Sequence, residues 1–321
     1  MRHHHLYRTG ALLALCAANA LTPMLVQAQN YPAQPVTMIV NFPPAGVTDL
    51  VGRALAASMS QNLKQTVIVQ NTGGAGGAIG ATAVATAPKD GYSIGFVATA
   101  ALTTLPQMRE VPYQVDSLEY ICRTFDVPVY LLVAPDSSFK SAGQLIAFAK
   151  ANPGKLNYAT VGPGSLPHLA SLDFADVAGV RMTHIPYQGE GPAVTDLLGK
   201  HVDVYFGTGA VATTHNLRRL GVAALKRQEE SPDTPTLGEL GYPIVWSVMG
   251  GLIAPHGISV AARQTLEKSC AEAVNTPAYK SALAQLKVGW AFSDSAEFKS
   301  LILADTARNR LVLKSADLLL K

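Results

Sequence analysis

Three loops rich in glycine, proline and hydroxyl side chains are the parts of this sequence that offer chemistry. They span residues 42–49, 73–80 and 162–168, and each lies between a strand-like run and a helix-like run. Backbone N–H groups in such a loop stand at the positive end of the following helix and suit an anion. We therefore expect a binding site for a small anion, held by amides and hydroxyl groups.

The third loop places Ser165 three residues before His168, which raises the alternative of an exported serine hydrolase. A nucleophile elbow requires G-x-S-x-G, whereas Leu166 and Pro167 follow this serine. No acidic residue is evident to orient the histidine, as a catalytic triad requires. The sequence favours capping or ligand contact by Ser165, so we expect no catalytic residue and no enzyme.

Neither a cofactor nor a metal is indicated. Gly74, Gly76 and Gly80 give G-x-G-x-x-x-G, which departs from the dinucleotide fingerprint, and no acidic residue follows about 20 positions later. A tight turn with close helix packing is the alternative to ligand contact for this loop. The histidines are dispersed, and no pair has the i, i+4 spacing of helical zinc ligands.

Alternating strand-like and helix-like runs position these loops, and the alternation starts again after Pro128. Such alternation is typical of an α/β fold with a doubly wound, mostly parallel sheet and flanking helices. We expect two α/β units, with the mostly helical residues 261–321 returning to cover the first. The expected strands are 36–40, 67–69, 93–97, 129–133, 156–160, 182–185 and 202–206, and the expected helices are 50–59 (capped by Thr48 or Asp49), 79–87, 142–151, 169–178 and 193–198.

Composition argues against a nucleic-acid-binding protein and against a disordered chain. The 321 residues are 48% hydrophobic and 15% charged, and 25 basic against 22 acidic side chains give a net charge of +3. Binding to nucleic acid requires a concentrated basic face, which a near-neutral chain without long basic runs does not offer. Disorder is equally excluded, because it requires low hydrophobicity and high net charge.

Residues 1–28 have the pattern of a cleaved secretory signal peptide. A basic start is followed by an apolar stretch, and the segment ends Val26-Gln27-Ala28. A membrane anchor is the alternative, but Asn19 and Pro23 cut the apolar run below the ~20 residues a span needs. Leu15 before Cys16 argues against a lipoprotein. We expect export to the periplasm.

Cys122 and Cys270 are the cysteines that remain after removal of the signal. An oxidising compartment permits them to pair. A disulfide requires their Cα atoms to lie within ~7 Å, and sequence spacing does not show this. We expect two separately buried thiols.

The chain after residue 28 resembles, nearly end to end, the substrate-binding receptors of tripartite tricarboxylate transporters, the TctC or Bug family. No single segment is decisive, but many matching segments occur in order. They are Tyr31-Pro32, residues 42–49, Asn71 with the glycine loop, Asp90-Gly91-Tyr92, residues 162–168, residues 184–189, Asp196-Leu197-Leu198, Thr234-Pro235-Thr236 and Ala254-Pro255.

The resemblance implies a two-domain periplasmic binding protein of the type II-like, Venus-flytrap kind. Domain 1 would be residues 29–127 plus 251–321, and domain 2 residues 128–250, with crossovers near 126–128 and 246–251. Closure would trap a small organic acid, and the closed state would be recognised by integral membrane subunits of the transporter. We expect a monomer.

The resemblance and the loops together give a predicted set of ligand-binding residues on two facing walls. The first wall comprises Phe42, Pro44, Ala45, Gly46, Val47, Thr48, Asp49, Gly76, Ala98 and Thr99. The second comprises Gly164, Ser165, His168, Tyr187, Gly189 and Asp203.

Five residues at four places in the chain depart from the family pattern. Ala45 stands at a usual glycine, Thr72-Gly73 at a basic-proline pair, Gln188 at a lysine and Gly207 at a frequent aspartate. The loss of charged positions predicts a ligand less polar than citrate, such as an aromatic acid or a longer dicarboxylic acid. A sensory module that presents its ligand to a membrane kinase is a further alternative to transport.

Overall fold

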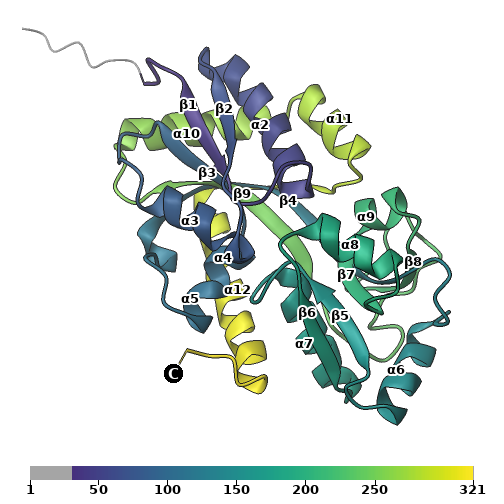
Figure 1. The fold of residues 1–321 in the computed structure, drawn as a ribbon. Helices are drawn as coiled ribbons and strands as arrows, with labels where there is room; N and C mark the ends of the chain where they lie inside the picture. The colour runs from purple at the N-terminus through teal and green to yellow at the C-terminus, as the bar shows by residue number, and fades with distance from the viewer. Residues whose placement is uncertain (1–30, 321) are drawn as a thin grey trace, which may run out of the picture. The chain divides into compact units, whose positions relative to one another are not determined.

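The protein is described by a computed structural model that covers residues 31–320 (Figure 1). The expected signal peptide, residues 1–28, lies outside the described residues. Within residues 31–320, no helix combines the length and the apolar character needed to cross a bilayer.

The first half of the sheet is built on β1 (Val36–Val40), which lies between β2 (Val67–Asn71) and β3 (Ser93–Ala98). Both pairings are parallel. The β1 run is apolar because both of its faces are covered: Met38 points into one core cluster and Ile39 into another. Two helices make the connections, α2 (Val47–Leu63) and α3 (Ala78–Ala85).

Two long strands, β4 (Leu118–Val133) and β9 (Ser247–Pro255), join the first half of the sheet to the second (Figure 1). They run antiparallel, and Asp126 to Pro128 pair with Met249 to Ser247. β9 also pairs antiparallel with β3, so the middle of the sheet is mixed rather than parallel. The predicted α/β class is confirmed, with parallel strands on either side of the antiparallel pair β9 and β4.

The second half of the sheet continues from β4 in the order β4-β7-β5-β6, with β8 also on β4. β5 pairs in parallel with both β6 and β7. Helices cover both faces of this half, and Leu131 and Leu132 point to opposite clusters. The elements are β5 (Leu156–Thr160), β6 (Met182–Pro186), β7 (Val204–Thr208), β8 (Arg218–Val222), α6 (Ala142–Ala151), α7 (Leu166–Ala178), α8 (Glu190–Leu198) and α9 (Gly209–Thr214).

The C-terminal segment returns to the first half, as its helical pattern predicts. α10 (Val260–Ala273) and α11 (Pro277–Gln285) pack on α2, and β10 (Trp290–Ser293) pairs with β4. Pro277 separates α10 from α11 and opens the second of these helices, because the Thr276 hydroxyl caps α11 and proline is tolerated at its first position. Short elements complete the described chain: α4 (Ala100–Thr103), α5 (Leu105–Met108) and the 3-10 turns Ala75–Gly77 and Val115–Ser117.

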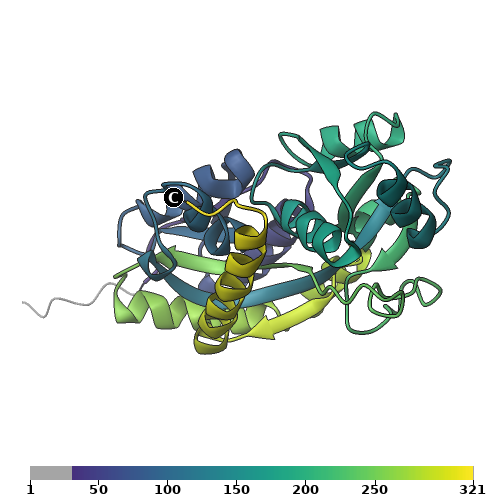
Figure 2. The same ribbon diagram turned by 90° about the horizontal axis from the view of Figure 1, so that it is seen from below.

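The last helix, α12 (Ser295–Ser315), contacts both halves of the molecule (Figure 2). It packs against β4, α4 and α7. Its early side chains Phe298 and Ile302 join a core cluster of the first half, and Val312 and Leu313 join one of the second half. The helix therefore links the two halves on one side of the crossing strands.

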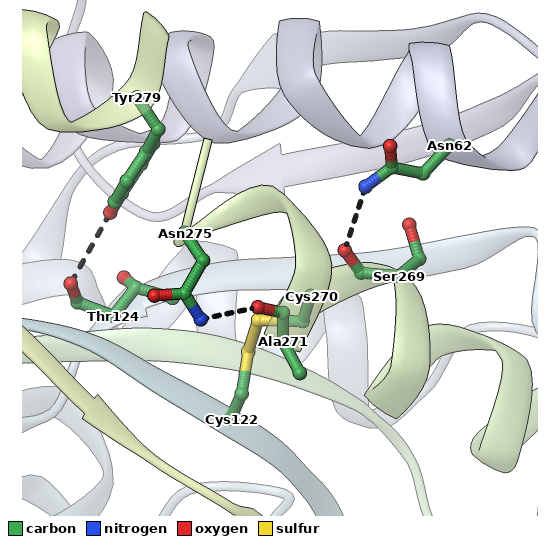
Figure 3. The surroundings of a disulfide bond; sticks show 8 residues. All are labelled: Asn62, Cys122, Thr124, Ser269, Cys270, Ala271, Asn275 and Tyr279. Atoms are coloured by element: carbon green, nitrogen blue, oxygen red, sulfur yellow. Dashed lines mark hydrogen bonds between the residues drawn. A yellow bond between two sulfur atoms is a disulfide. The ribbon is translucent and has the colours of Figure 1, made fainter. Parts of the chain in front are cut away.

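Cys122 and Cys270 form a disulfide, so the expectation of two separate thiols is wrong (Figure 3). Their Cα atoms lie 6.6 Å apart, although 148 positions separate them in the sequence. The cause is tertiary: α10 packs across the face of β4 that carries Cys122, and both residues belong to one core cluster. Nearby, the Tyr279 hydroxyl donates to the Thr124 carbonyl oxygen at 3.3 Å.

Several boundaries also differ from the predictions. β4 begins at Leu118 rather than at 129, and α8 begins at Glu190 rather than at 193. α2 begins at Val47 with Gly46 as its N-cap, so neither Thr48 nor Asp49 caps it. β7 begins at Val204 rather than at 202, and the Asp203 carboxylate just before it accepts a hydrogen bond from the Asn157 backbone N–H at 2.8 Å.

Candidate functional site

A cavity of about 400 Å³ lies where loops from both halves of the sheet meet. Its walls are the segments that follow the carboxyl ends of β1, β3, β5, β6 and β7. Ligands of open α/β sheets bind at this edge, and the volume suits a small molecule. The lining residues are Phe42, Pro43, Pro44, Ala45, Gly46, Val47, Thr48, Ala98, Ala100, Val161, Ser165, Leu166, Pro167, Gln188, Gly189, Glu190, Gly191, Pro192, Val194, Tyr205, Thr208, His215 and Val248.

Asp49 shapes the first wall from behind. Its carboxylate accepts hydrogen bonds from the Ala45 backbone N–H at 2.9 Å and from the Asn71 amide at 2.8 Å, and it pairs with Arg53 at 2.9 Å. The same Asn71 amide donates to the Phe42 carbonyl oxygen at 3.0 Å. Burial raises the pKa of Asp49, but the bonds from Arg53, Asn71 and Ala45 outweigh it and hold that pKa below its usual range.

Ala45 adopts a left-handed backbone conformation, with φ of 69°. This region costs an L-residue about 1–2 kcal/mol, and glycine occupies it freely. The hydrogen bond from its N–H to Asp49 keeps the loop in this conformation. The alanine therefore adds a methyl group to the cavity wall at the expense of backbone strain.

Ser165 and His168 on the second wall each have a backbone partner of their own. The Ser165 hydroxyl donates to the Gly162 carbonyl oxygen at 2.6 Å, and the Gly164 N–H donates to His168 Nδ1 at 3.0 Å. His168 stacks on His184 with ring centroids 4.2 Å apart. Burial, and then the charge of His184, lower the pKa of His168 to about 3, so its ring is neutral near pH 7. The nucleophile–base hydrogen bond of a hydrolase is not formed between these two side chains.

Glu190 and Tyr205 bring ionisable groups to the cavity that the sequence analysis did not single out. The Tyr205 hydroxyl donates to Glu190 Oε1 at 2.9 Å. Burial raises the pKa of Glu190, and the hydrogen bond from Tyr205 opposes that rise. The available signal was position alone: Glu190 opens a helix two residues after Gln188, which already departs from the family pattern.

The positive electrostatic potential of the cavity comes from backbone. No lysine or arginine lines it among residues 31–320. Instead, α2, α7 and α8 all begin at the cavity, and the residues lining it include Gly46 to Thr48, Ser165 to Pro167 and Gly189 to Gly191. Helix N-termini carry unpaired N–H groups and a partial positive charge. The cavity is therefore suited to an anion without a buried cation.

The structure brings part of the predicted ligand-binding set to this cavity. The predicted residues that line it are Phe42, Pro44, Ala45, Gly46, Val47, Thr48, Ala98, Ser165 and Gly189. The lining residues that the sequence analysis did not include are Pro43, Ala100, Val161, Leu166, Pro167, Gln188, Glu190, Gly191, Pro192, Val194, Tyr205, Thr208, His215 and Val248. Many of these are apolar side chains whose spacing also fits ordinary core positions.

The remaining predicted residues, Asp49, Gly76, Thr99, Gly164, His168, Tyr187 and Asp203, are not among those lining the cavity. Besides the contacts of Asp49, Gly164, His168 and Asp203 given above, Thr99 Oγ1 donates to the Met249 carbonyl oxygen at 3.2 Å. The Tyr187 hydroxyl donates to Asp196 at 2.6 Å. Asp49, Gly164 and His168 hold the loops that form the walls, whereas Asp203 lies at the start of β7, away from the carboxyl edge of the sheet.

The glycine loop serves close packing between elements. A Cβ at Gly80 would lie 2.6 Å from Asn41 Cα, so α3 packs directly against the end of β1. A Cβ at Gly76 would lie 3.2 Å from the Pro163 carbonyl oxygen, so the second and third loops touch. This supports the tight-turn alternative for the loop.

The described residues do not form a metal-binding cluster. Residues 31–320 contain no group of three or more His, Cys, Asp or Glu side chains placed to hold a metal ion.

Comparison with known proteins gives consistent similarities. Residues 51–318 match the model of a family described as "Tripartite tricarboxylate transporter family receptor". The structure of the periplasmic binding protein BugD is 32% identical, with a TM-score of 0.82 over 90% of this chain and 99% of BugD. An R. palustris protein solved with adipate is 26% identical, with a TM-score of 0.84 over 89% and 98% of the two chains. MatC from Rhodopseudomonas palustris, solved with malate, is 25% identical, with a TM-score of 0.80 over 88% and 100%.

Proposed function

The chain belongs to the tripartite tricarboxylate transporter receptor family, and from that premise we propose that it captures a small organic carboxylate in the cavity and delivers it to a transporter's integral membrane subunits. Members of this family are substrate-binding receptors and not enzymes. A serine hydrolase is set aside accordingly.

The observation that carries the proposal is the convergence of three helix N-termini on one cavity. Amides and hydroxyl groups at these ends hold a carboxylate without the cost of burying an ion pair. The adipate and malate in the structures of two similar proteins support a carboxylate as the ligand of this chain. The apolar remainder of the lining favours a di- or tricarboxylate with a carbon chain, or an aromatic acid.

Capture would occur by closure of two domains around the cavity. We assign residues 29–127 with 251–321 to one domain and residues 128–250 to the other, with β4 and β9 as the connections. The cavity takes residues from both sets, so a ligand that contacts both favours the closed state. The protein acts as an exported monomer, its residues 1–28 removed as a signal peptide, in the periplasm.

Thermal-shift and calorimetric titration with mono-, di-, tricarboxylic and aromatic acids tests the binding proposal. A ligand at roughly 100 times its Kd should stabilise the protein by about 2.7 kcal/mol. No shift and no heat across the whole panel would refute carboxylate binding. Uptake of the acid that binds, by cells with and without the receptor, tests delivery to the transporter.

An isosteric charge variant tests whether the ligand binds in this cavity. Gln188→Glu adds a negative charge to the lining without changing side-chain size, so the affinity for an anion should fall by about threefold or more. Gln61→Glu makes the same change on an exposed part of α2 that does not line the cavity, and affinity should stay at the parental value. Equal effects of the two variants would place the ligand elsewhere.

A further inference from the structure

Glu190 is an acidic side chain in a cavity otherwise suited to an anion. It lines the main cavity and also an adjoining cavity of about 220 Å³, to which Ala45, His215 and Lys287 contribute. Its Oε1 accepts the hydroxyl of Tyr205, a residue that is only 1% exposed. Glu190 is therefore held at the junction of the two cavities by a buried partner.

No charged partner neutralises this carboxyl group within the described chain. Lys287 and His215 line the same adjoining cavity, yet neither forms an ion pair with Glu190 within 4.0 Å among the described residues. The arrangement thus differs from that of Asp49, whose charge is balanced by Arg53 at 2.9 Å. The Glu190 carboxylate can accept further hydrogen bonds besides the one from Tyr205. The carboxylate of a ligand has no hydrogen to donate to it.

In its ionised form, which the hydrogen bond from Tyr205 favours, Glu190 repels a carboxylate, so the carboxylate of a ligand should lie at the first turns of α2 and α7. Glu190 instead suits a hydrogen-bond donor on another part of the ligand. An O–H or N–H group on the ligand gains a charge-assisted hydrogen bond there, whereas a ligand without one leaves a desolvated acceptor unpaired.

We propose that Glu190 is a specificity-determining residue that accepts a hydrogen bond from a hydroxyl or ammonium group of the ligand. The receptor then prefers hydroxy- or amino-substituted carboxylates over their unsubstituted counterparts. Tyr205 is a positioning residue that holds the carboxyl group by its hydroxyl. This inference rests on the proposed carboxylate binding and narrows it.

Matched pairs of acids test the inference by calorimetry. The pairs are malate and succinate, 4-hydroxybenzoate and benzoate, and 6-aminohexanoate and hexanoate, which differ in the donor group. In at least one pair the donor-bearing acid should bind about tenfold or more tightly, because a site built to hydrogen-bond a group rejects its analogue. If the only binders in the wider panel lack an O–H or N–H donor, or if the unsubstituted member binds equally well, the inference is overturned.

Two variants separate specificity from general binding. Glu190→Gln keeps the size and one acceptor atom, so the ratio of affinities within the pair should fall below about threefold. Tyr205→Phe should reduce the same ratio, because the carboxyl group of Glu190 loses the hydroxyl that holds it. Glu229→Gln, an exposed glutamate outside the cavity, should leave the ratio unchanged.

An unchanged ratio in Glu190→Gln overturns the inference even if carboxylates bind. The absence of any binding by the parental protein across the whole panel instead refutes the proposed function, and with it the premise of this inference. The two failures are therefore distinguishable.

Discussion

Cys122 on β4 and Cys270 on α10 are joined by a disulfide that closes a loop across a sequence separation of 148 residues. The loop contains every strand of the second half of the sheet beyond β4. Both ends of the bond lie in the core of the first half, so the bond fixes the returning C-terminal segment to the sheet (Figure 3). It does so without touching the cavity, which neither cysteine lines.

Replacing both cysteines, Cys122→Ala with Cys270→Ala, should lower the free energy of unfolding by about 2–4 kcal/mol, because the unfolded chain gains conformational freedom. Urea unfolding of the oxidised parent and the double variant measures this difference. Reduction of the parent should give a loss of the same size. Carboxylate affinity should stay unchanged, and an unchanged unfolding midpoint would contradict the prediction.

Ala45→Gly should stabilise the protein, by up to about 1 kcal/mol, because glycine adopts a φ of 69° without strain. The greater freedom of glycine in the unfolded chain offsets part of this gain. The measurement is again the free energy of unfolding in urea.

Two glycine variants on α2 serve as controls for Ala45→Gly. Lys64→Gly replaces a second left-handed residue, with φ of 53°, at the end of the helix, and should also stabilise. Ala57→Gly lies on an exposed part of the helix interior and should destabilise by about 0.5–1 kcal/mol. If all three variants destabilise, strain at Ala45 is not significant.

The stacked pair of His168 and His184 should make the protein sensitive to acid. Burial lowers the pKa of both rings, that of His168 to about 3, whereas an unfolded histidine titrates near pH ~6.5. Below that pH the unfolded state binds more protons than the folded state. Stability is therefore complete above pH ~6.5 and falls as the pH decreases toward 3, by at most about 1.4 kcal/mol per pH unit for His168.

Unfolding in urea at pH 7, 6 and 5 measures this slope. His168→Asn retains a side-chain acceptor for the Gly164 N–H but does not titrate. Its stability at pH 7 should be lower because of lost packing, and its slope between pH 7 and 5 should be shallower. A slope equal to that of the parent would show that His168 is not responsible.

Local pattern alone determined much of this protein. The apolar run of β1 predicts a strand buried on both faces, and the turn after it predicts a helix start at the sheet edge. Because a strand end and the next helix start are adjacent in the sequence, the placement of Phe42 to Thr48 in the cavity follows from short-range structure. The same holds for Ser165 and Gly189, each the N-cap of the following helix.

Only the tertiary structure determined the features that depend on contacts between segments distant in the sequence. The disulfide, the antiparallel placement of β9 between β3 and β4, and the Tyr205–Glu190 hydrogen bond arise only when segments that are apart in the sequence pack together. The buried position of His168 on α7 likewise depends on its stacking with His184 on β6. Hydrophobic periodicity reports which face of an element is buried, but not which partner buries it. The sequence therefore indicated which loops lie at the sheet edge, and only the fold determined which side chains meet in the cavity.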